Sequence, residues 1–195
     1  MILKSVLTKN WCSLLRTLLC NLGFHDVWMY QTIGNIEIFL SHVKQRIKDQ
    51  FLQSWNEHVT NSSRGVFYSS FSSFCFQPYL HILQIDKFRN AVTKLRVSSH
   101  RLCIETGRWA KPNAVPLNQR LCTTCNLLED EFHFVCECNL FSDLRRMYIP
   151  RYYRVRPSMQ KFMELLKSDR QTLVNNLSVY VYKAFELRNN VLYQT

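Results

Sequence analysis

Four cysteines and one histidine within seventeen residues constrain this chain more than any other feature of its sequence. Cys122 and Cys125 are followed by His133 and Cys138, in the pattern C-x2-C-x7-H-x4-C. Zn²⁺ prefers four tetrahedral ligands drawn from thiolate and imidazole, and a two-residue spacer folds the backbone so that both thiolates point at one ion. His133 and Cys138 converge only if the chain between them bends or begins a helix. The spacing therefore predicts one zinc site made by these four residues.

Cys136 leaves the ligand set open, because it can replace Cys138 or complete a set of four thiolates with no histidine. Without a metal, the same residues would be buried, reduced cysteines and a hydrogen-bonded histidine. Glu131 lies two residues before His133 and raises the question of a catalytic zinc. A catalytic zinc keeps one position open, whereas four Cys and His ligands close the coordination sphere. We therefore expect a structural zinc, with Cys138 as the fourth ligand.

The composition supports a folded protein in a reducing compartment. With 195 residues, 47% of them hydrophobic, the chain can bury a core, and disorder is not expected to dominate. No apolar run reaches the roughly 18 residues that a membrane span needs. Lys9, Asn10 and Arg16 interrupt any signal-like segment near the N-terminus. We expect a protein that is neither secreted nor membrane-bound and that lies in the nucleus or cytoplasm, where close Cys/His spacing favours metal over disulfides.

Apolar residues recur every three or four positions through most of the sequence, which is the spacing of amphipathic helices. The expected fold class is mainly α, a helical bundle with a small irregular CCHC zinc-knuckle insertion. A helical region is expected over 1–97, a zinc-binding region with basic flanks over 98–153, and C-terminal helices over 154–195. Within them, helices are expected over 11–22, 35–58, 86–97, 134–148, 159–166 and 173–192, and a loop over 107–120.

Positive charge is concentrated in the middle of the chain. Residues 87–156 carry thirteen Lys and Arg against six Asp and Glu, and the net charge of the whole chain is +11. Arginine pairs with phosphate through its planar fork, and tyrosine or tryptophan stacks on unpaired bases. Basic and aromatic residues alternate on both sides of the cysteine cluster, which predicts contact with RNA or DNA. The predicted contact residues are Lys94, Arg96, Arg101, Arg108, Trp109, Lys111, Arg145, Arg146, Tyr148, Arg151, Tyr152, Tyr153, Arg154 and Arg156.

The remaining reactive residues are expected to be structural. Cys12, Cys20, Cys75 and Cys103 lie among apolar residues and are expected to fill the core. The acidic run 129–131 is expected to be a solvated helix start beside the zinc site. The other histidines are scattered, with no nucleophile or carboxylate at a recognisable catalytic spacing.

Residues 98–153 resemble the C-terminal zinc-binding region of non-LTR (LINE-type) retrotransposon reverse transcriptases. The matching segments are LRVSSHRL, ETGRW, the C-x2-C pair, EDEFHF leading into the last cysteine, and LRRMYI. The resemblance places Cys122, Cys125, His133 and Cys138 in the ligand positions. Cys136 falls where such sequences usually have an aliphatic residue. In that family the cysteine–histidine set follows the polymerase thumb and is thought to help grip nucleic acid.

The resemblance implies a piece of such a polyprotein without its enzyme. The polymerase site of that family needs paired aspartates, and this chain has no adjacent Asp-Asp. The chain is also too short to include the endonuclease of these elements. We therefore expect a non-catalytic nucleic-acid-binding module with one structural zinc and no small-molecule substrate, which also contacts other parts of a reverse transcriptase. The alternatives are a helical protein-interaction module and a degenerate transposon remnant that binds no nucleic acid.

Overall fold

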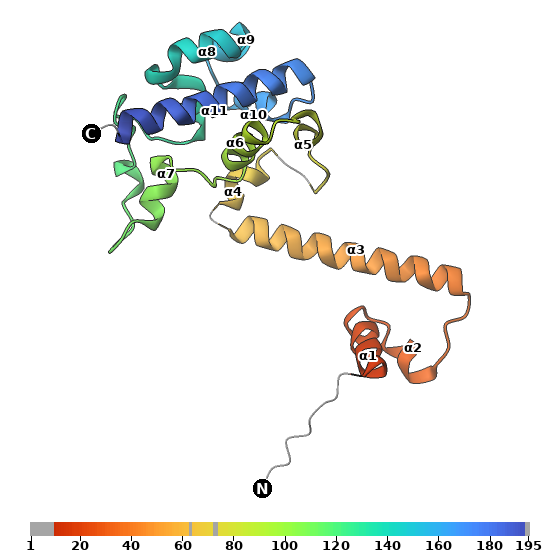
Figure 1. Cartoon of the computed structure of the whole chain (residues 1–195). Helices are drawn as coiled ribbons and strands as arrows, with labels where there is room; N and C mark the ends of the chain where they lie inside the picture. Colours follow the sequence, from red (N-terminus) through yellow and green to blue (C-terminus); the bar gives the residue numbers. More distant parts are fainter. Residues whose placement is uncertain (1–9, 63, 72–73, 194–195) are drawn as a thin grey trace. The chain divides into compact units, whose positions relative to one another are not determined.

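The computed structural model describes residues 10–62, 64–71 and 74–193, and helices dominate these residues (Figure 1). An isolated bridge between Leu121 and Leu128 is the only β pairing among them. The mainly α class is therefore confirmed. None of the described helices combines the length and the apolar composition needed to cross a membrane.

The chain divides into two compact units, residues 1–57 and 58–195. The expected boundaries at 97 and 153 differ from this division, because residues from 58–97, 98–153 and 154–195 share one hydrophobic core. The first unit contains α1 (Trp11–Asn21), α2 (His25–Tyr30) and most of α3 (Ile36–Asn61). The second unit contains the remaining helices. These are α4 (Gly65–Ser69), α5 (Pro78–Ile82), α6 (Asp86–Arg96), α7 (Cys103–Thr106), η1 (Gly107–Trp109), η2 (Leu117–Gln119), η3 (His133–Glu137), η4 (Asn139–Phe141), α8 (Ser142–Tyr148), α9 (Arg151–Arg154), α10 (Met159–Lys167) and α11 (Gln171–Tyr193).

Local sequence explains where several helices begin and end. The Asn10 side chain accepts a hydrogen bond of 2.8 Å from the Ser13 N–H, which caps α1, and Gly23 follows this helix at a φ of +81°. Ser158 caps α10 by accepting from the Lys161 N–H. Asp86 is the first residue of α6, and its carboxylate pairs with Arg89. The caps fix the ends of helices whose stability comes mainly from packing.

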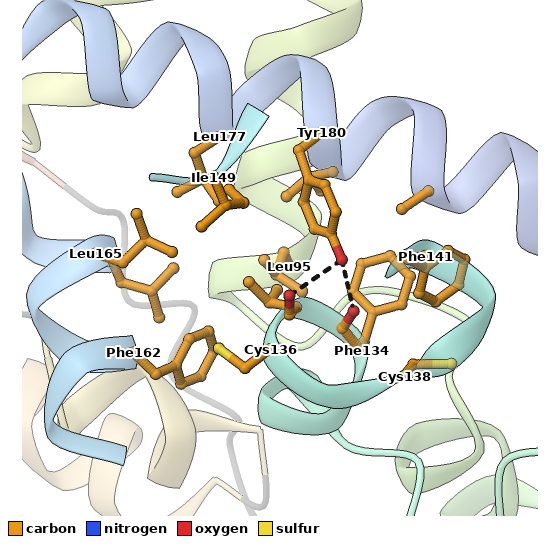
Figure 2. Close-up of a cluster of buried hydrophobic side chains, with 14 of the residues drawn as sticks. Leu95, Phe134, Cys136, Cys138, Phe141, Ile149, Phe162, Leu165, Leu177 and Tyr180 are labelled. Atoms are coloured by element: carbon orange, nitrogen blue, oxygen red, sulfur yellow. Dashed lines mark hydrogen bonds between the residues drawn. The ribbon is translucent and has the colours of Figure 1, made fainter. Parts of the chain in front are cut away.

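The core of the second unit is built around α11. Tyr180, Val181 and Ala184 are completely buried on its inner face. Figure 2 shows Tyr180 reaching from α11 to the turn η3, where its hydroxyl donates to the carbonyl oxygens of Phe134 (2.9 Å) and Val135 (3.1 Å). This is the point at which the longest helix of the unit holds the cysteine–histidine segment.

Two of the arginines predicted to contact nucleic acid are internal. Arg96 is 4% exposed, lies between the rings of Phe71 and Tyr79, and donates to the Leu166 carbonyl and the Gln77 side chain. Burial lowers the pKa of its guanidinium, and electrostatic interactions with Tyr79 and Tyr68 partly offset this effect.

The second internal arginine is Arg145, which is 8% exposed. It donates to the carbonyl oxygens of Val135 (2.8 Å) and Cys138 (2.7 Å). The prediction that Arg96 and Arg145 contact nucleic acid is therefore wrong, because internal carbonyls already occupy both guanidinium groups.

Candidate metal centre

The four predicted ligands come together in the second unit. The ligand atoms of Cys122, Cys125, His133 and Cys138 all lie within 4.8 Å of one another. The Cys138 sulfur is 3.8 Å from the sulfur of Cys122 and 3.8 Å from that of Cys125. Tetrahedral zinc with Zn–S bonds of about 2.3 Å separates two thiolate ligands by about 3.8 Å. The cluster could therefore hold one metal ion with little rearrangement of the sulfur atoms.

The first two ligands project from a tight turn. The Cys122 N–H donates to the Leu127 carbonyl at 2.7 Å, and the Asn126 N–H donates back to the Cys122 carbonyl at 2.8 Å. Asn126 adopts a φ of +54°, a left-handed conformation that asparagine tolerates better than most residues. This reversal places Cys125 beside Cys122, as the two-residue spacing predicted.

The other two ligands lie at the ends of one π-helical turn, η3. The Cys138 N–H donates to the His133 carbonyl at 2.8 Å, so this hydrogen bond spans five residues instead of four. The wider turn brings residues five apart to the same side, which resolves how His133 and Cys138 converge. Asp130 caps the turn by accepting from the His133 N–H at 2.7 Å.

The side chain of His133 fits a metal ligand. It is buried, and neither ring nitrogen has a hydrogen-bond partner among the described residues. The closest carboxylate oxygen, from Glu137, is 3.6 Å from Nδ1, which is too long for a hydrogen bond. A buried polar atom without a partner costs free energy, and coordination through one nitrogen would remove part of that cost. Three sulfurs and one imidazole are also a donor set that zinc prefers.

Cys136 lies outside this group. Figure 2 shows the side chain of Cys136 directed toward Phe162 in the hydrophobic core. The sulfur of Cys138 points in another direction, away from Phe162. Burial raises the pKa of the Cys136 thiol to about 12, as expected for a sulfhydryl among apolar side chains. The structure thus selects Cys138 over Cys136 and does not support an all-thiolate set.

Glu129 and Glu131, expected to be solvated, are both buried. Glu129 binds both Nε (2.7 Å) and Nη2 (2.6 Å) of Arg188 on α11, and it accepts from the Cys103 N–H at 2.7 Å. Burial alone would raise the pKa of Glu129, but the hydrogen bonds from Arg188 and Cys103 bring it below the ordinary value.

Glu131 lies just before η3 and connects this turn to the segment after α6. It accepts hydrogen bonds from the Ser98 hydroxyl (2.6 Å) and from Nε2 of His100 (2.9 Å). Because His100 Nδ1 accepts from the Leu102 N–H at 3.3 Å, the proton lies on Nε2. Burial would raise the pKa of Glu131, yet these hydrogen bonds lower it. The expectation of a solvated acidic run is wrong because two of its side chains have internal partners.

The remaining predicted nucleic-acid residues divide by exposure. Arg108, Tyr148, Tyr153 and Arg154 are half-buried. Trp109 is 60% exposed with the Arg64 guanidinium 5.6 Å from its ring, and Tyr152 is 57% exposed with a hydrogen bond to Glu164. The other exposed members are Lys94, Arg101, Lys111, Arg146, Arg151 and Arg156. Exposed cations and aromatics thus lie on both segments that flank the metal centre in sequence.

The four isolated cysteines do not behave alike. Cys12 and Cys75 are exposed, so the expectation that they fill the core is wrong. Cys20 is half-buried and lies 3.4 Å from Nδ1 of His25. Cys103 is also half-buried, and burial together with Glu129 raises the pKa of its thiol to about 11.

Comparison with known proteins adds no relative to this picture. No protein-family model matches the chain, and neither the curated proteins nor the solved structures provide a match.

Proposed function

We propose that this protein binds one structural zinc ion through Cys122, Cys125, His133 and Cys138, and that its zinc-stabilised unit binds RNA or DNA. The proposal of a structural zinc rests on the number of ligands. Four Cys and His side chains fill the coordination sphere and leave no position for a substrate. When bound, zinc supplies a cross-link between the turn at 122–127 and the π-helical turn η3. A structural role also agrees with our proposal that the chain is not an enzyme.

The residues around the ligands have a defined part in this role. Asn139 donates its N–H to the Cys125 sulfur at 3.4 Å, and a hydrogen bond of this kind stabilises a thiolate. Arg145 holds the carbonyl of Cys138, so the last ligand is oriented from α8. These contacts position the sulfurs before the metal binds and so reduce the entropic cost of binding.

Metal content of the purified, reduced protein tests the zinc proposal. We expect one zinc per chain in the wild type and in Cys136→Ser, and less zinc in His133→Ala and Cys138→Ser. Cys136→Ser is the matched control because it removes a buried sulfur from the same turn. Loss of zinc in Cys136→Ser with retention in Cys138→Ser would contradict the ligand assignment.

The nucleic-acid proposal is supported by the exposed basic and aromatic residues of α9 and its flanks. Arg151 and Arg156 are exposed and form no ion pair with a described residue, and Tyr152, next to Arg151 in the sequence, is also exposed. Arginine with an exposed aromatic ring suits single strands, in which base stacking contributes about 1–3 kcal/mol per base. The resemblance of residues 98–153 to the zinc-binding region of LINE-type reverse transcriptases agrees with this choice of ligand and suggests a polymerase as a further partner.

RNA binding at several salt concentrations tests this proposal. Arg151→Gln/Arg156→Gln should weaken binding to a single-stranded RNA and flatten its salt dependence by about one unit of slope per lost phosphate contact. Lys44→Gln/Lys48→Gln removes the same charge from exposed positions of α3, outside the zinc-stabilised unit, and is the control. Equal affinity and slope in the wild type and in Arg151→Gln/Arg156→Gln would remove these residues from the nucleic-acid surface.

A second candidate function is protein interaction through the first unit. No described side chain of α3 is buried, and Ile36, Ile38, Leu40 and Ile47 are all at least 40% exposed. Apolar surface of this kind commonly marks a protein contact. Self-association that is insensitive to salt, without measurable RNA binding, would favour this candidate.

A further inference from the structure

A pocket of about 530 Å³ lies between α6, α11 and the segment Ser99–Arg101. Figure 1 shows α6 on one side of α11 and α8 with α9 on the other, so this pocket lies away from the exposed arginines of α9. Its volume is within the range of about 300–1,000 Å³ that is usual for small-ligand sites. The pocket therefore offers a binding place whose lining residues are separate from those of α9.

The walls of the pocket combine cations with aromatic rings. Lys87, Lys94 and Arg101 line it, all three are exposed, and none forms an ion pair with a described residue. Glu186 is the sole carboxylate among the lining residues, and its proximity raises the pKa of the Tyr182 phenol. The pocket thus has an excess of positive charge, which favours an anion.

The other lining groups suit a nucleobase. The Lys87 ammonium lies 5.1 Å from the ring centre of Tyr182, and that ring is half-buried in the pocket wall. Asn90 on α6 and Asn189 on α11 add exposed amide groups that can both donate and accept hydrogen bonds. An aromatic ring, two amides and three cations together match a base joined to a phosphate.

The wall formed by Ser99–Arg101 is held in place by Glu131, which lies just before η3. Ser98 adopts a left-handed φ of +48° and closes the C-terminus of α6, with the Ser99 N–H donating to the Lys94 carbonyl at 2.8 Å. Glu131 accepts from both Ser98 and His100, so this strained turn has two internal hydrogen bonds to support it. Arg101 therefore projects from a fixed backbone beside the pocket.

We infer that this pocket binds a nucleotide unit, with Lys87, Lys94 and Arg101 on its phosphate and Tyr182, Asn90 and Asn189 beside its base. The inference deepens the proposed nucleic-acid function and rests on it where the nucleotide belongs to a strand. A free nucleotide and a nucleotide within an RNA strand offer the same chemistry, so both are tested.

The test uses the full chain loaded with zinc, with AMP and a short labelled oligo(A) RNA as probes. Lys87→Gln/Lys94→Gln should weaken binding of at least one probe by about five- to tenfold, because two phosphate ion pairs are lost. Lys44→Gln/Lys48→Gln, with the same loss of charge on α3, should leave it unchanged. Asn189→Trp fills the pocket without changing the charge and should weaken binding to a similar extent.

The outcomes separate this inference from the proposed function. AMP binding that both pocket variants lose, without RNA binding by the wild type, supports the pocket and contradicts the nucleic-acid proposal. RNA binding that Arg151→Gln/Arg156→Gln loses but both pocket variants retain, without AMP binding, overturns the pocket and leaves the proposed function intact. Absence of wild-type binding to both probes overturns the inference as well.

Discussion

The buried ion pair between Arg188 and Glu129 offers the sharpest test of the packing described above. The two side chains are 6% and 7% exposed and meet through two parallel hydrogen bonds. Arg188→Met keeps an unbranched apolar stem but leaves the Glu129 carboxylate buried without its cation. Removing one partner of such a pair costs about 3–5 kcal/mol. For a chain of this size, that loss corresponds to a fall in Tm of roughly 6–20 °C.

Thermal and urea unfolding of four proteins measures the coupling. Glu129→Gln keeps an acceptor for the Cys103 N–H but removes the charge, so it too should destabilise the protein by leaving Arg188 without an anion. Arg188→Met/Glu129→Gln should be more stable than the sum of the single changes predicts, by about 2 kcal/mol or more, because no unpaired charge stays buried. A cost below about 1 kcal/mol for Arg188→Met, or strict additivity in the cycle, would refute the reasoning.

The difference in stability between the wild type and Arg188→Met should depend on pH in a defined direction. The folded-state pKa of Glu129 is lowered, so its contribution is fully present above its unfolded pKa and is lost as the pH falls through the folded value. The stability gap between the wild type and Arg188→Met should therefore be widest near neutral pH. It should narrow below about pH 4, where the isolated carboxyl becomes neutral. A gap that grows on acidification would contradict the ionised pair.

Three further predictions concern the same unit. Tyr180→Phe should cost about 1–2 kcal/mol in urea unfolding, because the Phe134 carbonyl loses its hydroxyl donor, and an unchanged midpoint would show that this hydrogen bond adds nothing. Gly107→Ala should destabilise by about 1–3 kcal/mol, because the new Cβ would lie 2.7 Å from Cγ of Arg120, whose guanidinium is fixed by two carbonyl oxygens. Chelation of zinc should increase hydrogen exchange at 122–138 far more than in α1, and equal protection with and without chelator would contradict the cross-link.

Sequence periodicity and spacing predicted what depends on neighbours along the chain. The long helices α3 and α11 follow from apolar residues every three or four positions. The candidate ligand set follows from the spacing of the cysteines and the histidine. The π-helical turn η3 brings His133 and Cys138 to the same side. Local chemistry was sufficient for these features.

Residues whose role depends on distant partners were not predictable in this way. Arg96 and Arg145 look like surface cations in the sequence. In the structure, Arg96 donates to a carbonyl of α10 and Arg145 to a carbonyl of η3. Glu129 finds its partner 59 positions later, in Arg188. The weak signal was that the acidic run 129–131 lies between the apolar residues 127–128 and Phe132, which suits buried and internally paired groups as well as a solvated helix start.

The position of α11 in the sequence has a consequence for how the protein is made. Ribosomes add about 5–20 residues per second, so the stretch from Cys138 to the end of α11 at Tyr193 takes roughly 3–11 seconds to synthesise. During that interval all four ligand side chains exist, while the helix that buries the neighbouring turn through Tyr180 is still incomplete. Metal capture can thus precede closure of the core, and a nascent chain starved of zinc would expose several thiols when oxidation and aggregation compete most strongly with folding.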